Sequence, residues 1–320
     1  MLAIGYNGLV LPDDLVIREG DIMSKVIRII RPSGSGGDQR LSENIETLRE
    51  AGFEVRSPEH RVKSLRWPYS DGTVSDRSRE LWHALTEQDS QIILCARGGY
   101  GASDLLPFLP WELLKSTPQK WLVGFSDITA LQSGLFARLS WPSIHGPMPA
   151  SALWGKNSFE DIERLMALFR SEHKSGWLSV SPLNDLADTS EDLSGVLFGG
   201  CFSVLCSLSG TPWFPQNCRG MVLFLEDIGE NPGQLMRHLN QLVQNDCLKQ
   251  VKGLIIGSLS DMDSELSDRA VKEALASRLH IPCWESNDFG HISPNMPLVN
   301  GAKCVIGQGS EHLNWTFEIS

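Results

Sequence analysis

Ser126 lies in the segment GFSD, between an apolar run and a stretch with helical spacing. A serine on a tight turn between a buried strand and a helix exposes its hydroxyl, and the N–H groups that begin the helix attract negative charge. Such a serine can act as a nucleophile. Ser126 and Asp127 are also good helix N-cap residues, and the local sequence alone favours the capping interpretation.

A nucleophilic serine needs a base to take its proton, usually a histidine that a carboxylate holds in the correct tautomer. Of the eight histidines, only His145 and His291 stand beside glycines in expected loops, where backbone and ligand can approach closely. The other six fall within helical patterns or in polar or terminal surroundings. His145 and His291 are therefore the two candidate bases.

A carboxylate to orient that base is expected near the end of the apolar run MVLFL, where Glu226 opens the segment LEDIGENPGQL. Carboxylates at such strand ends are more often caps or surface groups. Asp227 and Glu230 compete for the same role, and the spacing does not choose among the three.

The segment Gly98-Gly-Tyr-Gly101 also follows an apolar run. It fails the dinucleotide-binding pattern G-x-G-x-x-G, because Asp104 stands where the third glycine is needed. A double glycine at a strand end can direct a backbone N–H at an oxyanion and stabilise a tetrahedral intermediate. An ordinary turn explains the pattern equally well.

Strands and helices alternate in the part of the chain that must position these groups. Strands are predicted at residues 26–30, 53–55, 92–95 and 121–124, and helices at 41–52, 75–88 and 128–139. This alternation predicts an α/β domain with a parallel sheet over about residues 24–150. Functional groups in such sheets gather at the carboxyl ends of the strands, where Gly98 and Ser126 both lie.

The second half of the chain predicts a mixed α/β domain over residues 194–320. Its strands are expected at 196–198, 221–225 and 253–256, and its helices at 234–243 and 267–279. Residues 151–193 are polar and turn-rich, with one helix expected at 159–169, and are interpreted as a linker. The amino-terminal domain then spans 1–150, with 1–22 as a possible extension that adds nothing to the fold.

Composition excludes several classes of protein. The net charge of -11 comes without a Lys/Arg cluster that could follow a phosphate backbone, so nucleic acid is not expected as a partner. No apolar run approaches the ~20 residues of a membrane-spanning helix. The first twenty residues lack a basic start and are interrupted by Pro12, Asp13 and Asp14, so no secretory signal is expected.

Cysteine usage points to a reducing compartment. The seven cysteines form an odd set without a CxxC pair and have mostly apolar neighbours. Buried free thiols in a cytoplasmic protein are the simplest interpretation, in preference to a disulfide framework or a zinc site.

Taken together, the motifs resemble one family, the LD-carboxypeptidases, which remove the terminal D-alanine from cytoplasmic muropeptides. The resemblance runs in the family's order from about Val26 to Ile306. Its segments are ARGGYGASDLLPFL at 96–109, VGFSDITALQSGLF at 123–136, HGPM at 145–148, FGGCFSVLCSLSGTPWFP at 198–215, LFLEDIGENPGQLMRHLNQL at 223–242, GLIIGS at 253–258 and FGH at 289–291.

The resemblance implies a catalytic set made of Ser126, Glu226 and His291. It also implies that the backbone N–H groups of Gly99 and Asp127 form the oxyanion hole. The family fold has a Rossmann or flavodoxin-like amino-terminal domain that carries the serine and a carboxyl-terminal domain that carries the glutamate and the histidine. The active site is expected in the cleft between them, in a homodimer that needs no metal or other cofactor.

A carboxypeptidase also needs a cationic or N–H-rich pocket for the free carboxylate of the leaving residue. Arg97 is the nearest candidate in the sequence, with Tyr100 beside it. Arg97 serves equally well as a structural ion-pair partner.

Some positions depart from the family pattern and leave the substrate open. Cys201 stands where members often have asparagine, and Ser286, Asn287 and Asp288 replace a gly-leu-pro run. Two alternatives follow: a peptidase of the microcin C self-immunity branch that cleaves peptidyl or aminoacyl nucleotides, and a non-catalytic muropeptide-binding protein. A general α/β-hydrolase is disfavoured, since GFSDI lacks the second glycine of G-x-S-x-G.

Overall fold

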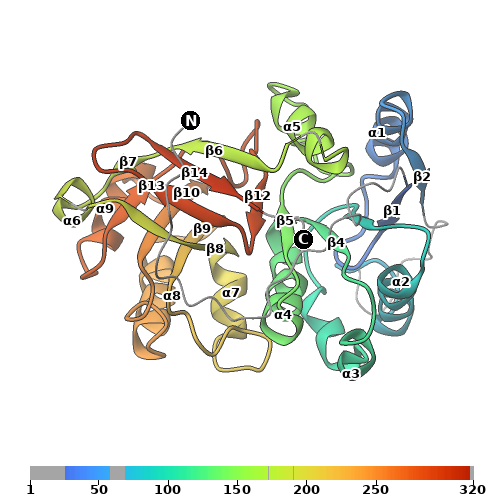
Figure 1. The fold of residues 1–320 in the computed structure, drawn as a ribbon, viewed down its shortest axis with the longest axis horizontal. Coiled ribbons are helices and arrows are strands. Elements are labelled where there is room, and N and C mark those ends of the chain that lie inside the picture. Colours follow the sequence, from blue (N-terminus) through green and yellow to red (C-terminus); the bar gives the residue numbers. More distant parts are fainter. Residues whose placement is uncertain (1–25, 58–68, 172, 190, 318–320) are drawn as a thin grey trace, which may run out of the picture.

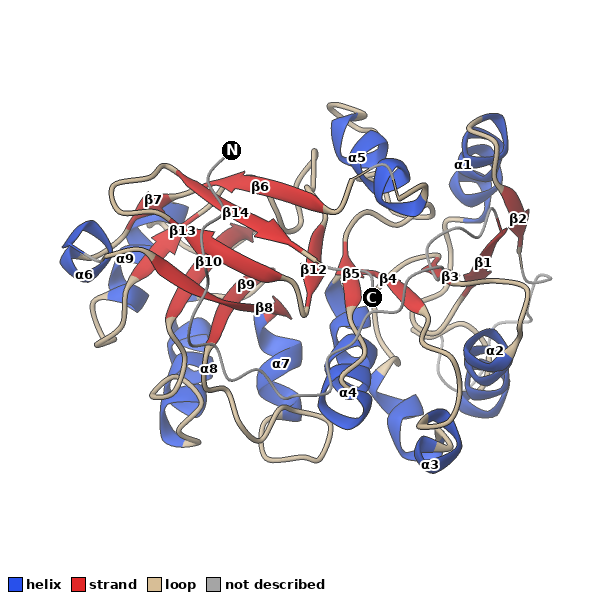
Figure 2. Ribbon diagram, viewed as in Figure 1, coloured by secondary structure: helices blue, strands red, loops and turns tan. Residues whose placement is uncertain are grey.

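Two β-sheets with helices packed against them organise the chain (Figures 1 and 2). The computed structural model describes residues 26–57, 69–171, 173–189 and 191–317. The expectation about residues 1–22 therefore lies outside the described residues. The architecture confirms the predicted fold class, an α/β protein with an amino-terminal parallel-sheet domain and a carboxyl-terminal mixed-sheet domain.

The first sheet has the strand order β12-β5-β4-β3-β1-β2 and is parallel from β5 to β2. Its strands from the first half of the chain are β1 (Val26–Ile30), β2 (Glu54–Arg56), β3 (Ile92–Cys95), β4 (Trp121–Gly124) and β5 (Ser143–His145). The helical segments are α1 (Asp38–Glu50), α2 (Val74–Thr86), η1 (Ser103–Phe108), α3 (Trp111–Leu114), η2 (Ser126–Ile128) and α4 (Thr129–Leu139). β3 and β4 are buried along their whole length, because helices cover both faces of a parallel sheet.

The second sheet has the order β6-β14-β13-β8-β9-β10-β11-β7, parallel from β8 to β11 and antiparallel outside this centre. Its strands are β6 (Ser175–Ser179), β7 (Ser181–Pro182), β8 (Leu193–Cys201), β9 (Met221–Ile228), β10 (Gly253–Ser260), β11 (Cys283–Glu285), β13 (Lys303–Ile306) and β14 (His312–Thr316). The helices of this half are α5 (Glu160–Phe169), α6 (Asp185–Thr189), α7 (Phe202–Leu208), α8 (Pro232–Gln244) and α9 (Asp268–Ala276).

The strands predicted at 26–30, 92–95 and 121–124 have the observed limits, and those predicted at 196–198, 221–225 and 253–256 form the centres or starts of longer strands. Residues 151–193, interpreted as a linker, contain α5 and α6 and contribute β6 and β7 to the second sheet. Conversely, β12 (Leu298–Asn300) comes from the second half of the chain but belongs to the first sheet, where it pairs antiparallel with β5.

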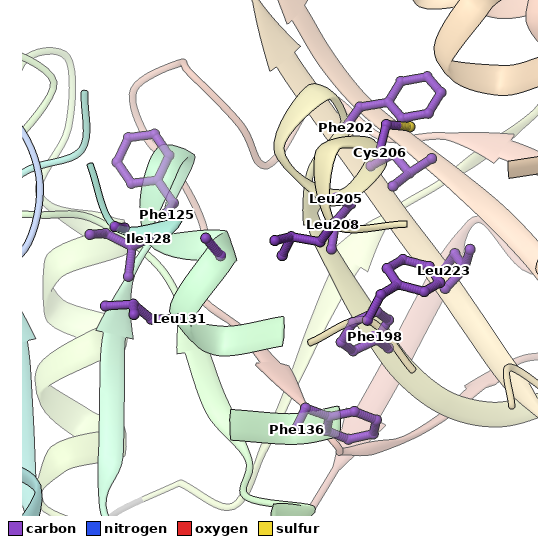
Figure 3. Packing of buried hydrophobic residues seen from close by; sticks show 14 of the residues in the cluster. Phe125, Ile128, Leu131, Phe136, Phe198, Phe202, Leu205, Cys206, Leu208 and Leu223 are labelled. Carbon is purple, nitrogen blue, oxygen red and sulfur yellow. The ribbon is translucent and has the colours of Figure 1, made fainter. Parts of the chain in front are cut away.

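One hydrophobic core continues from the first sheet's helices to the second sheet (Figure 3). α4 and α7 lie side by side below the strands where the two sheets adjoin (Figure 1), and the ring centroids of Phe136 on α4 and Phe198 on β8 are 4.9 Å apart. Asn300 on β12 adds a buried polar link, since its Oδ1 accepts from Gly199 N at 2.8 Å. These contacts fix the relative position of the two halves, between which the candidate site lies.

Among the described residues, none of the helices combines the length and the apolar character that crossing a membrane requires. All seven cysteines are buried free thiols.

Candidate active site

Ser126 occupies the turn between β4 and α4 in a left-handed conformation, with φ at 61°. A non-glycine residue in this region is strained by roughly 1–3 kcal/mol, and a strained turn of this kind holds a nucleophile's hydroxyl above the end of a strand. Neither Ser126 nor Asp127 caps the helix that follows. The buried Asp127 carboxylate instead accepts from Ser33 Oγ at 2.5 Å and from Ala102 N at 2.8 Å. The turn is therefore held by Asp127, and the Ser126 hydroxyl is left for another partner.

That partner is His291. The Ser126 Oγ lies 2.9 Å from His291 Nε2, and His291 Nδ1 lies 2.6 Å from Glu226 Oε2. With Nδ1–H donating to the carboxylate, Nε2 is the nitrogen that accepts from the serine hydroxyl. The structure thus brings together the three residues of the expected set, from three segments that are distant in the sequence.

Glu226 lies at the carboxyl end of β9 opposite Cys201, and its side chain is fully buried. Asp227, the first competing carboxylate, accepts from Ser203 N at 2.7 Å and from Ile228 N at 2.9 Å and so closes the turn into α7. Glu230 follows in the loop after β9, and the structure records no contact between it and His291. Among these carboxylates the one that contacts the histidine is Glu226.

The contact between Glu226 and His291 shifts the pKa values of both residues in the direction that a catalytic base requires. Burial lowers the pKa of His291, but the charge of Glu226 and its hydrogen bond outweigh this and raise the pKa above the ordinary value. Burial raises the pKa of Glu226, but the His291 charge and hydrogen bond outweigh it and lower that pKa. Glu226 is therefore ionised beside an imidazole that gains stability as it takes a proton.

The loop that carries His291 is held by two residues that the sequence analysis did not single out. Asn295 Oδ1 accepts from Gly290 N at 3.0 Å, and Asn295 N donates to Asp161 Oδ2 at 2.8 Å. Asp161 is buried at the start of α5, far away in the sequence. No local signal links Asp161 to the histidine, since the contact exists only in the folded chain.

The residues that replace the family's gly-leu-pro run hold the same loop from its other side. Ser286 N donates to Ile256 O at 3.0 Å, Asn287 Oδ1 accepts from Lys272 Nζ at 3.3 Å, and Asp288 Oδ2 accepts from Ser179 N at 2.6 Å. Cys201, the other departure, is buried and directs its Sγ to Asp227 Oδ1 at 3.5 Å. Each of these residues has a partner outside the Ser126–His291–Glu226 contacts.

Two N–H groups are expected to form an oxyanion hole: Asp127 follows Ser126 in the chain, and Gly99 follows Gly98, which packs against Ser126. Gly98 O accepts from Gly34 N at 3.1 Å, and because a trans peptide directs its C=O and N–H in opposite directions, Gly99 N–H points away from Gly34. A Cβ built on Gly98 would lie 3.4 Å from Asp127 N. Neither Gly99 N–H nor Asp127 N–H donates to another residue in the described part of the chain.

We expect Gly98→Ala to lower kcat/KM about a hundredfold or more. The added methyl would lie 2.8 Å from Ser126 Cβ and 3.0 Å from its Oγ, so the serine must move, and small displacements at a reacting atom are costly. Steady-state kinetics with thermal unfolding of the same preparation measure this. Gly307→Ala is the control, because the nearest atom to its added Cβ is 3.6 Å away; equal rates for the two variants would contradict the prediction.

Arg97 and Tyr100, the expected substrate-binding residues, flank the double glycine. Arg97 Nη1 donates to Ser35 O at 2.9 Å, while its Nε is buried without a hydrogen-bond partner among the described residues. Tyr100 is 45% exposed, and its hydroxyl donates to Asp104 Oδ1 at 3.3 Å. Arg97 forms no ion pair with a described carboxylate, so it retains donors for an anion.

His145, the other candidate base, does not contact Ser126. It is fully buried on β5, and neither ring nitrogen has a hydrogen-bond partner in the described structure. Burial lowers the pKa of His145 to about 4, against the opposing charge of Glu226. The ring is therefore neutral at neutral pH, and its pKa is shifted in the opposite direction to that of His291.

We expect this buried ring to make stability depend on pH. The unfolded chain takes up a proton on His145 near pH 6.5 and the folded chain only near pH 4, so stability is fully present above pH 6.5 and is lost as pH falls toward 4. The loss is about 3 kcal/mol in the free energy of unfolding. Urea unfolding of wild type and His145→Phe at both pH values checks this, and parallel pH dependence of the two proteins would contradict it.

In the described residues, no group of three or more histidine, cysteine, aspartate or glutamate side chains could hold a metal ion.

Comparison with known proteins agrees with the fold and the site. The LD-carboxypeptidase N-terminal domain model matches residues 27–146, and the LD-carboxypeptidase C-terminal domain model matches residues 194–306. The chain therefore belongs to the LD-carboxypeptidase family of hydrolases, as the motifs predicted.

Three relatives illustrate the range of this family. The murein tetrapeptide carboxypeptidase of Pseudomonas aeruginosa is 29% identical over 88% of this chain and 92% of its own. The crystal structure of muramoyltetrapeptide carboxypeptidase from Oxalobacter formigenes superposes with a TM-score of 0.79 at 28% identity, covering 92% of this chain and 100% of that one. The structure of MccF in complex with glutamyl sulfamoyl guanosine gives a TM-score of 0.79 at 21% identity, covering 96% and 100%, a similarity that shows the fold alone.

Proposed function

We propose that this protein is a serine LD-carboxypeptidase that releases the terminal D-alanine from muropeptide tetrapeptides in the cytoplasm. The observation that carries the proposal is the continuous chain of contacts from Ser126 Oγ through His291 to Glu226, at 2.9 and 2.6 Å. The names of the P. aeruginosa and O. formigenes relatives support the choice of substrate. A homodimer, which the family resemblance implies, is part of this proposal and is tested by sedimentation.

In the proposed mechanism His291 takes the proton of Ser126 as the serine oxygen attacks the scissile carbonyl, and Glu226 stabilises the imidazolium that forms. The oxyanion of the tetrahedral intermediate accepts from Gly99 N–H and Asp127 N–H. The imidazolium then gives its proton to the leaving D-alanine nitrogen, and an acyl-enzyme remains. A water activated by His291 hydrolyses the acyl-enzyme and restores the serine.

Mass spectrometry of a tetrapeptide that ends in meso-diaminopimelate-D-alanine tests the reaction. Wild type is expected to remove one alanine residue, and Ser126→Ala is expected to leave the peptide intact. If wild type left the tetrapeptide unchanged but cleaved an aminoacyl or peptidyl nucleotide, the self-immunity type of substrate would replace the muropeptide. Binding of the tetrapeptide without cleavage and without labelling of Ser126 by a serine-directed phosphonate would favour a binding protein.

We further propose that Arg97 binds the free carboxylate of the leaving D-alanine, since it is half-buried next to the double glycine and forms no ion pair with a described carboxylate. Arg97→Ala is expected to raise KM for the tetrapeptide and to lower kcat/KM about tenfold or more, a loss of about 1.4 kcal/mol. Arg97→Lys keeps the charge and is expected to lose less. Steady-state kinetics decide, and a loss well below tenfold in Arg97→Ala would argue against direct binding.

A further inference from the structure

The glycine-rich segment PSGSGG, residues 32–37, follows β1 and supplies no member of the proposed triad. Its start runs against residues 98–101, the glycine loop that follows β3. Gly34 N donates to Gly98 O at 3.1 Å, and a Cβ built on Gly34 would lie 2.6 Å from that oxygen and 3.3 Å from Gly99 Cα. A side chain at position 34 would separate the two backbones. The segment therefore holds the peptide between Gly98 and Gly99, whose N–H is one of the two proposed oxyanion donors.

Ser33, the residue before Gly34, contacts the residue that supplies the other donor. Its side chain is fully buried, and its Oγ donates to Asp127 Oδ2 at 2.5 Å. A hydroxyl that donates to a carboxylate forms a short and strong hydrogen bond. The same carboxylate oxygen accepts from Ala102 N at 2.8 Å, directly after the glycine loop. Since the backbone N–H of Asp127 is the second proposed oxyanion donor, two adjacent residues hold both parts of the proposed hole.

Arg77 on α2 joins the same segment to the other end of the glycine loop. Its side chain is 1% exposed. Nη1 donates to Pro32 O at 2.8 Å and also to Gly101 O, and Nη2 donates to Asp104 Oδ2 at 3.2 Å. A guanidinium group presents its donors in one rigid plane, so it fixes the separation of the carbonyl groups that it bridges. The backbone before and after Ser33 is therefore bonded to the glycine loop on both sides.

We propose that residues 32–34 support the oxyanion hole and that Ser33 is its positioning residue, which sets the N–H groups of Gly99 and Asp127 relative to each other. This inference rests on the proposed function, in which both groups stabilise the oxyanion formed at Ser126. The two donors must reach one oxygen, yet they come from loops that follow two different strands. Without the Ser33 hydroxyl, the Asp127 carboxylate keeps one of its two recorded donors, and the spacing of the N–H groups is no longer fixed.

The first test compares Ser33→Ala with Ser90→Ala in the rate at which a fluorophosphonate labels Ser126. Both variants remove one hydrogen bond of a fully buried hydroxyl, but Ser90 Oγ donates to Ile92 O at 2.9 Å, at the amino end of β3 and so at the opposite edge of the sheet. The reagent places a phosphoryl oxygen where the oxyanion would form, and it needs no knowledge of the natural substrate. We expect labelling to be about tenfold slower in Ser33→Ala and unchanged in Ser90→Ala. Thermal unfolding should show similar losses of stability in the two variants.

Steady-state kinetics with the tetrapeptide provide a readout that lost stability alone would not move. Because the oxyanion develops only after the substrate has bound, Ser33→Ala is expected to lower kcat about tenfold and to leave KM within about twofold of the wild-type value. Gly34→Ala is a second variant that acts on the other donor, since its Cβ would displace Gly98 O, and it should show the same slow labelling and the same split between kcat and KM. Gly307→Ala is its control, because the nearest atom to that added Cβ is 3.6 Å away.

A folded Ser33→Ala that is labelled at the wild-type rate overturns the inference. Equal losses in Ser33→Ala and Ser90→Ala also overturn it, because lost stability would then explain both, and so does a raised KM with unchanged kcat. If Ser33→Ala did not fold, a wild-type labelling rate in Gly34→Ala would overturn the inference in its place. A wild type that the phosphonate does not label contradicts the proposed nucleophile itself, so the two proposals fail in distinguishable ways.

Discussion

Ser126→Ala is expected to lower kcat/KM for the tetrapeptide about 10⁴-fold or more, a loss of at least about 5 kcal/mol of transition-state stabilisation. The variant removes the attacking oxygen 2.9 Å from His291 Nε2 but leaves the histidine, the carboxylate and the N–H groups of Gly99 and Asp127 in place. Residual activity over the uncatalysed reaction then comes from binding and from these donors. Steady-state kinetics measure the loss, and isothermal titration with the tetrapeptide should show nearly unchanged affinity.

The backbone conformation of Ser126 allows a second prediction for the same variant, which concerns its stability. The residue has φ at 61°, a region that alanine tolerates no better than serine, so the strain at the turn is retained in Ser126→Ala. We therefore expect the free energy of unfolding to stay within about 1 kcal/mol of the wild-type value. Activity within tenfold of wild type would contradict the assignment of Ser126 as the nucleophile, whatever the stability of the variant.

The strands and helices that carry the site could be predicted because their local patterns are strong. β3 and β4 are uninterrupted apolar runs that end in glycine-containing turns, and both strands begin and end at the predicted residues. β6 was not predicted, since SGWLS exposes most of its residues at the edge of the sheet and has no apolar run. β12 has only three residues, and its pairing with β5 is decided by tertiary packing that a local pattern does not contain.

The candidate site also contains some residues that local patterns predict and others that only the folded chain brings together. The turn at Ser126 and the strand end at Glu226 were predictable from position, and the family motifs selected Glu226 and His291 from their competitors. Spacing alone could not separate His145 from His291, because both stand beside glycines and differ only in what the folded chain places around them. Ser33 lies in the glycine-rich segment PSGSGG that follows β1, but its hydrogen bond to Asp127 joins the ends of two separate strands, which no local pattern indicates.

Glu226→Gln is expected to lower kcat about 10³–10⁴-fold with a small effect on KM. The side chain keeps its size in a fully buried position, but the amide nitrogen can donate to His291 Nδ1 and so favour the tautomer with a proton on Nε2. That tautomer cannot accept the Ser126 proton. Even with the amide oxygen facing Nδ1, the imidazolium loses the negative charge that raises its pKa, so the acid limb of the kcat/KM profile should move to lower pH.

Glu230→Gln is the matched control for this variant, because it makes the same change of charge in the loop that follows β9, at a carboxylate for which the structure records no contact with His291. It should keep kcat and the pH profile of the wild type. Kinetics over pH 5–9 on both variants, with urea unfolding to confirm that each is folded, provide the comparison. If the two variants lost activity equally, the net charge of the segment would account for the effect, and the orientation of His291 by Glu226 would not. A loss confined to Glu226→Gln, together with the shifted acid limb, is the combination that only a buried carboxylate bonded to the catalytic base can produce.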